Sequence, residues 1–212
     1  METLTNKRAI VITGGPGMGK TSIIESLEWS GYACVPESGR DIIQRQLKSK
    51  GDKLPWADRM GFAQEMFKRA VADYKQTVDQ QTYTFFDRGI VDSIGYLSLC
   101  NLPISDEIRL AAAHYRYYDK VFITPPWPEI YVNDRERKQS FEEAEITYKT
   151  MKKVYTDFGY SLIEVPKLPI QDRAMFILQC LKINDMPKPS DVSRAVLNIQ
   201  GSPSQRGNPH DA

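Results

Sequence analysis

The sequence has few cysteines and no long hydrophobic run. Its three cysteines, Cys34, Cys100 and Cys180, lie far apart and form no C-x-x-C pair, which argues against a disulfide framework and a cysteine zinc site and indicates a reducing compartment. No stretch approaches the ~18 consecutive apolar residues that a membrane-spanning helix needs. The opening METLTNKRAIVIT has too short an apolar segment for a signal peptide. We therefore expect a cytoplasmic protein without a membrane span.

An excess of charge of either sign is also missing. The chain of 212 residues carries 28 Lys+Arg against 27 Asp+Glu, a formal net charge of +1. A protein whose main role is to coat nucleic acid or an anionic membrane needs a strong positive excess, so we expect no nucleic-acid partner and no such membrane-coating role. The apolar fraction of 41% and the charged fraction of 26% are those of a folded protein, and the length corresponds to one domain at ~150 residues per domain. A homo-oligomer is compatible with these values but is not indicated by them.

Short apolar segments alternate with amphipathic ones along the chain. Five segments rich in β-branched and aromatic residues are expected as strands, at residues 8–13, 32–36, 82–86, 120–124 and 161–165. Segments with apolar residues every three or four positions are expected as helices, at residues 20–29, 42–47, 56–81, 92–99, 105–118, 142–158 and 170–183. Since parallel strands are joined by right-handed crossovers, the alternation predicts an α/β fold, a parallel sheet with helices on both faces.

The composition changes near residue 186. Residues 186–212 are rich in proline, serine, glycine and asparagine, which is typical of a flexible tail. We therefore expect one domain over residues 1–185 and a tail over residues 186–212. One apolar stripe in the tail is spaced as in a helix and leaves a short docking helix as the alternative; it consists of Val192, Ala195, Val196 and Ile199.

A glycine-rich segment follows the first expected strand. It reads GGPGMGKT and matches the P-loop pattern G-x-x-x-x-G-K-[ST], whose glycines turn backbone N–H groups toward phosphates. Lys20 supplies a positive charge for the outer phosphates, Thr21 offers its hydroxyl to Mg²⁺, and the helix that begins here directs its positive dipole end at the same anion. The segment predicts ATP and Mg²⁺ as cofactors. The expected nucleotide-binding residues are Gly14, Gly15, Pro16, Gly17, Met18, Gly19, Lys20, Thr21 and Ser22.

The residues that end the third expected strand favour a kinase among P-loop proteins. A GTPase of the common type carries [NT]-K-x-D, but Asn6-Lys7 lies before the P-loop and lacks the aspartate. An ATPase machine usually ends this strand with Asp-Glu, whose glutamate activates water, whereas this chain has Asp87-Arg88. Asp87 can hold Mg²⁺, and Arg88 can hold phosphoryl oxygens or the acceptor. We therefore expect a phosphotransferase, with NTP hydrolysis as the fallback.

The second expected strand ends in PESGR and adds two candidate residues. The carboxyl ends of parallel strands line the ligand crevice of an open sheet, so Glu37 and Arg40 are expected beside Asp87 and Arg88. Glu37 is placed to take the proton of an attacking hydroxyl, with Asp87 as the other candidate base. The alternative for Glu37 is a carboxylate that interacts with the dipole of the following helix. Substrate contacts are expected from Glu37, Arg40 and Arg88.

A cationic cluster follows the fourth expected strand, after the segment PPWP. The sequence NDRERK places Arg135 and Arg137 where small kinases carry a closing lid. Arginines there could neutralise charge on the transferring phosphoryl group. An exposed charged turn is the alternative. The expected catalytic residues are Lys20, Glu37, Asp87, Arg88, Arg135 and Arg137.

These motifs together resemble a family of ATPase-like P-loop proteins. The family includes the ribosylnicotinamide kinase domain of NadR and an insect GTP-binding trafficking protein, and the resemblance runs from about Arg8 to Ile183. It implies a P-loop kinase fold with sheet order 2-3-1-4-5, a nucleotide held by the P-loop, and Mg²⁺ near Thr21 and Asp87. It does not extend to the acceptor, because the substrate-side residues do not match closely. The resemblance rests on Glu37-x-x-Arg40, Asp87-Arg88, Pro126-Trp127 and Asp134-x-x-Arg137.

Two functions from different classes fit these residues. The first is a kinase that transfers the γ-phosphoryl group of ATP to a hydroxyl of a nucleoside-like or other small metabolite. The second is a nucleotide-dependent switch, using ATP or GTP, that hydrolyses slowly and recruits a protein or lipid partner. The pair Asp87-Arg88 favours the kinase, because an arginine in this position cannot activate water as a base.

Overall fold

The computed structural model describes residues 2–131 and 140–183, and its centre is a parallel sheet of five strands in the order β3-β4-β2-β6-β7. Every neighbouring pair in this sheet is parallel. Counted in chain order, these strands give the order 2-3-1-4-5, which confirms the prediction. The strands are β2 (Ala9–Gly14), β3 (Ala33–Val35), β4 (Thr84–Asp87), β6 (Lys120–Thr124) and β7 (Ser161–Glu164).

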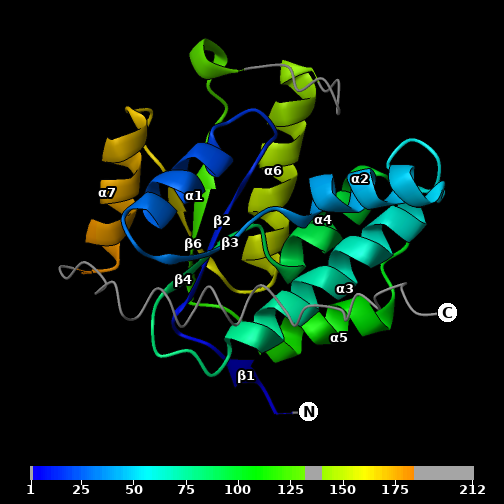
Figure 1. Cartoon of the computed structure of the whole chain (residues 1–212), viewed down its shortest axis with the longest axis horizontal. Helices are drawn as coiled ribbons and strands as arrows, with labels where there is room; N and C mark the ends of the chain where they lie inside the picture. Colours follow the sequence, from blue (N-terminus) through cyan, green and yellow to red (C-terminus); the bar gives the residue numbers. More distant parts are fainter. Residues whose placement is uncertain (1, 132–139, 184–212) are drawn as a thin grey trace, which may run out of the picture.

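Helices cover both faces of the sheet, so its central strand is buried on both sides. All six residues of β2 are buried, as expected for a parallel strand between two helical layers. Ile10 and Ile12 pack with α1 (Lys20–Trp29) and α7 (Ile170–Cys180) on one face. Ala9 and Val11 pack on the other face (Figure 1) with the larger helical layer, which contains α3 (Arg59–Thr77), α4 (Ile90–Leu99), α5 (Asp106–His114) and α6 (Phe141–Asp157).

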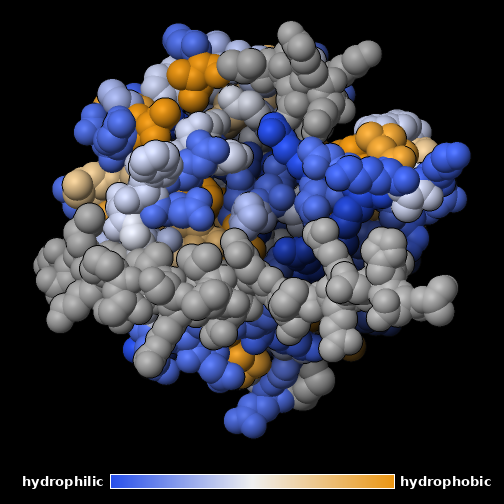
Figure 2. All heavy atoms as spheres, viewed as in Figure 1, coloured by the Kyte–Doolittle hydropathy of each residue, from blue (hydrophilic) through white to orange (hydrophobic). Residues whose placement is uncertain are grey.

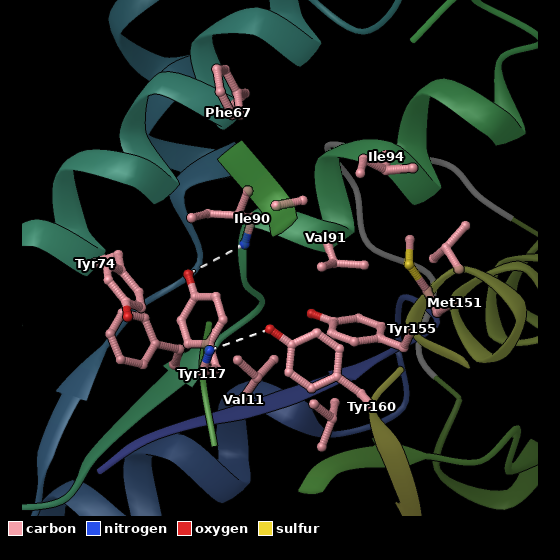
Figure 3. Close-up of a cluster of buried hydrophobic side chains, with 14 of the residues drawn as sticks. Val11, Phe67, Tyr74, Ile90, Val91, Ile94, Tyr117, Met151, Tyr155 and Tyr160 are labelled. Atoms are coloured by element: carbon pink, nitrogen blue, oxygen red, sulfur yellow. Dashed lines mark hydrogen bonds between the residues drawn. The ribbon is translucent and has the colours of Figure 1, made fainter. Parts of the chain in front are cut away.

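Buried tyrosines tie this larger layer to the sheet (Figure 3). The Tyr117 hydroxyl accepts a hydrogen bond from the Ile90 backbone N–H at 3.3 Å, and the Tyr160 hydroxyl accepts one from the Tyr117 N–H at 3.3 Å. The Tyr155 hydroxyl donates to Asp92 at 2.6 Å. Burial raises the pKa of the Tyr117 and Tyr155 hydroxyls well above the ordinary value, so both stay protonated at neutral pH.

The structure corrects the helix predicted over residues 105–118. Helix α5 ends at His114, and Tyr115–Arg116 forms strand β5, which pairs in parallel with β1 (Leu4–Thr5). The Tyr74 hydroxyl lies 2.8 Å from the Leu4 carbonyl oxygen and 2.9 Å from that of Arg116. A long-range side-chain contact from α3 therefore supports this short sheet, and such a contact leaves no local pattern in the sequence.

The remaining elements differ from the prediction mainly at their ends. Helix α3 begins at Arg59 rather than near residue 56, because the Asp58 side chain accepts a hydrogen bond from the Gly61 N–H at 2.9 Å and caps the helix. Helix α4 begins at Ile90, two residues before the predicted start. Helix α2 spans Ser38–Ser49, and the short 3₁₀ helix η1 spans Pro128–Ile130.

Hydrophilic residues dominate the face shown in Figure 2, and hydrophobic residues lie there in small separate groups. Trp29, with 91% of its surface exposed, is the most exposed of the large hydrophobic side chains in the described residues. None of the helices in the described ranges is both long enough and apolar enough to cross a membrane. Residues 184–212, which include the expected tail over residues 186–212, lie outside the described ranges.

Replacing Tyr74 with Phe should lower the free energy of unfolding by about 0.5–1.5 kcal/mol, because the hydroxyl that joins α3 to β1 and β5 is lost. Urea denaturation measures this change. Tyr83→Phe is the control, since the Tyr83 hydroxyl makes no hydrogen bond to another described residue. An equal effect of the two substitutions would contradict the role given to Tyr74.

Candidate nucleotide and acceptor site

The P-loop connects β2 to α1 and depends on glycines at three positions. Gly14, Gly17 and Gly19 have φ angles of 134°, 68° and 75°, a region that residues with a Cβ rarely adopt. Gly15 instead allows a close approach, since a Cβ there would meet the backbone of Ala144 in α6. The loop is thus shaped locally by its glycines and seated directly against α6.

Lys20 and Thr21 begin α1 at the end of the loop. Lys20 is buried, and its Nζ donates a hydrogen bond to the Gly15 carbonyl at 2.6 Å. The Thr21 hydroxyl donates to Asp87 Oδ2 at 3.1 Å. The structure therefore brings together the lysine, the threonine and the strand-end aspartate that the sequence selected. Ser22 follows on α1 and is half-buried.

Asp87 is the residue of this group that fits a metal ion best. Only 4% of its surface is exposed, and its Oδ1 is a buried atom without a hydrogen-bond partner in the described chain. Burial raises the pKa of Asp87, and the nearby Lys20 partly offsets this effect. A hydroxyl and a carboxylate oxygen are ligands that Mg²⁺ accepts, with phosphates and waters completing the shell. The unpaired Oδ1 beside Thr21 thus suits Mg²⁺. The described residues hold no group of three or more His, Cys, Asp or Glu that could bind a metal without a nucleotide.

Arg88 is held in a strained backbone conformation by three acceptors. Its φ angle is 77°, which costs about 1–2 kcal/mol for a residue with a Cβ. Its Nε donates to Glu37 Oε1 at 3.2 Å, and its Nη1 donates to the Gly14 carbonyl at 3.1 Å and to Asp92 Oδ1 at 3.3 Å. Burial acts against the charge, but Glu37 and Asp92 outweigh it and raise the pKa of Arg88. The guanidinium is therefore a fixed cation beside the P-loop.

Asp92 belongs to the site although sequence reasoning placed it only at a helix start. Its carboxylate is buried and accepts hydrogen bonds from the Thr13 hydroxyl at 2.5 Å, the Tyr155 hydroxyl at 2.6 Å and the Gly89 N–H at 2.7 Å, besides Arg88. The one available signal was a carboxylate within the otherwise apolar run GIVDSIGYL. Its role depends on the packing of α6 onto α4, which the sequence does not display.

The other predicted residues fall in different places. Glu37 directly precedes α2, and its side chain makes no capping hydrogen bond to that helix; its carboxylate pairs with Arg88 instead. Arg40 is exposed on α2 and is not among the residues that line the adjacent cavity. Arg135 and Arg137, the predicted lid residues, lie outside the described residues.

A cavity of about 540 Å³ adjoins the P-loop at Pro16. Glu37, Asp87, Arg88 and Asp92 all contribute to its wall. The rest of the wall is largely apolar and comes from α2, α3, α4 and α6, including Ile43, Phe62, Met66, Tyr96, Leu99 and Met151. The arrangement offers a second compartment, next to the phosphate-binding loop, for a small molecule that is mostly apolar and has a polar end.

Replacing Asp87 with Asn should stabilise the nucleotide-free protein at neutral pH and raise its Tm by about 2–4 °C. Because burial raises the pKa of Asp87 in the folded state, the ionised carboxylate costs stability above that pKa. The cost shrinks as the pH falls below the raised pKa and is gone below the ordinary pKa of aspartate. The gain should therefore shrink from neutral to acidic pH. Thermal unfolding over this range measures it, with the exposed Asp119→Asn as the control; a gain that grows in acid would contradict the assignment.

Comparisons with known proteins identify a family and several similar folds. Residues 9–173 match the family model described as "AAA domain", whereas no curated protein matches the sequence. One similar solved structure is NadR in complex with NR, with a TM-score of 0.65 and 16% identity over 86% of this chain and 54% of that chain. Another is deoxyadenosine kinase from M. mycoides with dCMP and dCDP, with a TM-score of 0.51 and 17% identity over 82% of this chain and 98% of that chain. A third is shikimate kinase from Acinetobacter baumannii with shikimate, with a TM-score of 0.50 and 15% identity over 85% of this chain and 96% of that chain.

These likenesses establish the α/β fold of P-loop kinases, and the chain spans about half the length of the NadR chain. They give no support to the trafficking relative that the motifs also suggested. The family model covers most of the chain, including the P-loop and the strand that ends in Asp87. The chain therefore belongs to the AAA domain family of P-loop proteins.

Proposed function

We propose that the protein is a small-molecule kinase that transfers the γ-phosphoryl group of ATP to a hydroxyl. The observation that carries the proposal is the cavity of about 540 Å³ beside the P-loop, with Glu37, Asp87 and Arg88 in its wall. An NTP hydrolase needs room only for water at this position, whereas the volume lies within the range of sites for small organic ligands. The similarity to the folds of shikimate kinase and deoxyadenosine kinase supports the same interpretation.

The P-loop side would hold the nucleotide. The backbone N–H groups of residues 14–22, other than Pro16, would surround the phosphates, and Lys20 would exchange its bond to the Gly15 carbonyl for phosphate oxygens. Thr21 and Asp87 would hold Mg²⁺, which, when bound, neutralises negative charge on the phosphates. Arg88 would hold oxygens of the transferring group, since its guanidinium is already fixed by three acceptors at the mouth of the cavity.

Glu37 is the stronger candidate for the base. Both carboxylates line the cavity, but Asp87 accepts a hydrogen bond from Thr21 and lies close to Lys20, on the proposed metal side of the site, whereas Glu37 pairs with Arg88. In the proposed step the acceptor hydroxyl gives its proton to Glu37, its oxygen forms a bond to the γ-phosphorus, and the bond from that phosphorus to the leaving oxygen of ADP breaks. The products are ADP and a phosphorylated acceptor.

The walls of the cavity favour an acceptor with a flat ring system. Phe62 and Tyr96 pack edge to face at 5.5 Å between ring centroids, and Trp56 adds a partly exposed ring. Arg59 and Asp73 provide polar groups on the same wall. Aromatic walls with a few polar groups are typical of sites that bind rings and select them by hydrogen bonds. A nucleoside-like metabolite has the required ring and hydroxyl.

Replacing Glu37 with Gln should lower the rate of phosphoryl transfer by about 10²–10⁴-fold while the Kd for ATP stays close to that of the wild type. Glutamine has the same shape and can still accept from Arg88 Nε, so the arginine keeps its place. ADP formation with a panel of nucleosides and hydroxylated acids measures the rate, and calorimetry measures the Kd. Glu25→Gln, exposed on α1, is the matched control.

The same assay distinguishes the alternatives. An unchanged rate in Glu37→Gln would remove Glu37 from the mechanism and leave Asp87 as the candidate base. ADP release that is slow and independent of every acceptor would overturn the kinase and favour the nucleotide-dependent switch.

A further inference from the structure

Arg173 is a buried cation without an anion. Only 5% of its surface is exposed, its Nη1 donates a hydrogen bond to the Met18 carbonyl at 3.5 Å, and its Nε has no partner in the described chain. No carboxylate of the described residues forms an ion pair with it, and burial alone lowers the pKa of its guanidinium. A buried charge without a counterion costs stability, so its presence here calls for a functional reason.

The position of Arg173 on α7 reinforces this point. Its neighbours on the inner face of the helix, Ala174, Ile177 and Leu178, are buried in the apolar core on the α1 side of the sheet. An arginine at the first turn of this face interrupts an otherwise apolar pattern. An apolar residue would fill the same position without the cost of desolvating a charge.

Arg173 lies directly against the P-loop. A Cβ on Gly19 would lie 2.7 Å from its Nη1, and its guanidinium sits 5.5 Å from the centroid of the Trp127 ring. The backbone N–H of Trp127 in turn donates to the Met18 sulfur at 3.2 Å. Met18, Gly19 and Trp127 therefore enclose the guanidinium at the end of the loop where α1 begins.

The sheet order puts this cluster on the opposite side of the P-loop from the acceptor cavity. Along the sheet, β3 and β4, which precede Glu37 and carry Asp87, lie on one side of β2, whereas β6 and β7, which precede Trp127 and Arg173, lie on the other. Arg173 does not line the cavity. Its charge is therefore available to a ligand in the P-loop rather than to the acceptor.

We propose that Arg173 is an additional nucleotide-binding residue, whose positive charge behind Met18 and Gly19 is neutralised by the phosphates when they fill the P-loop. The inference rests on the proposed nucleotide binding and adds to it a residue outside the P-loop motif. In a low-dielectric interior the attraction acts through the thin backbone of the loop. In the nucleotide-free protein the unpaired charge of Arg173 lowers stability. Binding of the phosphates reverses this loss.

Replacing Arg173 with Gln should have opposite effects on the free and bound protein. The Tm of the nucleotide-free protein should rise, because a buried charge is removed, while the Kd values for ATP·Mg²⁺ and for tripolyphosphate should increase about 10–100-fold. The Kd for adenosine should not change. Arg173→Lys keeps the charge and should bind both phosphate ligands more tightly than Arg173→Gln.

The control is Arg109→Gln, which removes an exposed charge on α5. Calorimetry measures the Kd values, and thermal unfolding measures the Tm.

Several outcomes would overturn the proposal. A lower Tm with unchanged Kd values would show that Arg173 only supports Met18 and Trp127. Weaker binding of adenosine and ATP with unchanged tripolyphosphate binding would assign Arg173 to the base instead of the phosphates. If Arg173→Gln does not fold, a Kd for tripolyphosphate in Arg173→Lys that equals the Kd in Arg173→Met would overturn it. A folded wild-type protein that binds neither ATP nor tripolyphosphate would refute the proposed nucleotide binding itself.

Discussion

The carboxylate of Asp92 joins the parts of the molecule that must keep fixed positions around the P-loop. It accepts hydrogen bonds from Thr13 at the end of β2, from Gly89 and Arg88 in the turn after β4, and from Tyr155 on α6. Because the carboxylate is buried, each donor that left it would expose an unsatisfied charge to the interior. Two strands and two helices are therefore positioned by one side chain, and the cavity lies among the elements that it joins.

Arg88 shows how this constraint produces a functional arrangement. The left-handed backbone at Arg88 is unfavourable by itself, but it aims the guanidinium at three acceptors that come from separate elements: Glu37, Gly14 and Asp92. The ion pairs compensate both the strain and the desolvation of the charge. The same environment leaves Asp87 Oδ1 without a partner, so the site keeps an acceptor for a ligand beside a cation that is held in place through its Nε and Nη1. The unpaired Asp87 Oδ1 lowers the stability of the ligand-free protein, and a ligand that binds this oxygen would restore it.

Much of this site follows from the sequence, because its information is local. The P-loop pattern and the apolar runs of the five strands are contiguous, and the rule that ligands bind at the carboxyl ends of parallel strands brings Glu37, Asp87 and Arg88 together without knowledge of their contacts. The short sheet of β1 and β5 could not be found in this way, since it depends on Tyr74, about 40 and 70 positions away along the chain. Asp92 and Arg173 were missed for the same reason: each looks like an ordinary helix residue until α6 or the P-loop packs against it.

The order of charged residues along the sheet bears on where the nucleotide and the acceptor would lie in the proposed reaction. From β3 to β7 the edge presents Glu37, then Asp87 and Arg88, then Lys20 in the P-loop, and finally Arg173. The net charge of +1 conceals this arrangement. The carboxylates of Glu37 and Asp87 lie on the β3 and β4 side together with Arg88, whereas Lys20 and Arg173 add positive charge at the P-loop and beyond it. Phosphates held by Lys20 and Arg173 would place the terminal phosphoryl group toward Arg88, between the loop and the cavity. In the proposed reaction Glu37, the candidate base, would then lie beyond the transferred phosphoryl group, and these charges would help to orient the nucleotide toward the acceptor.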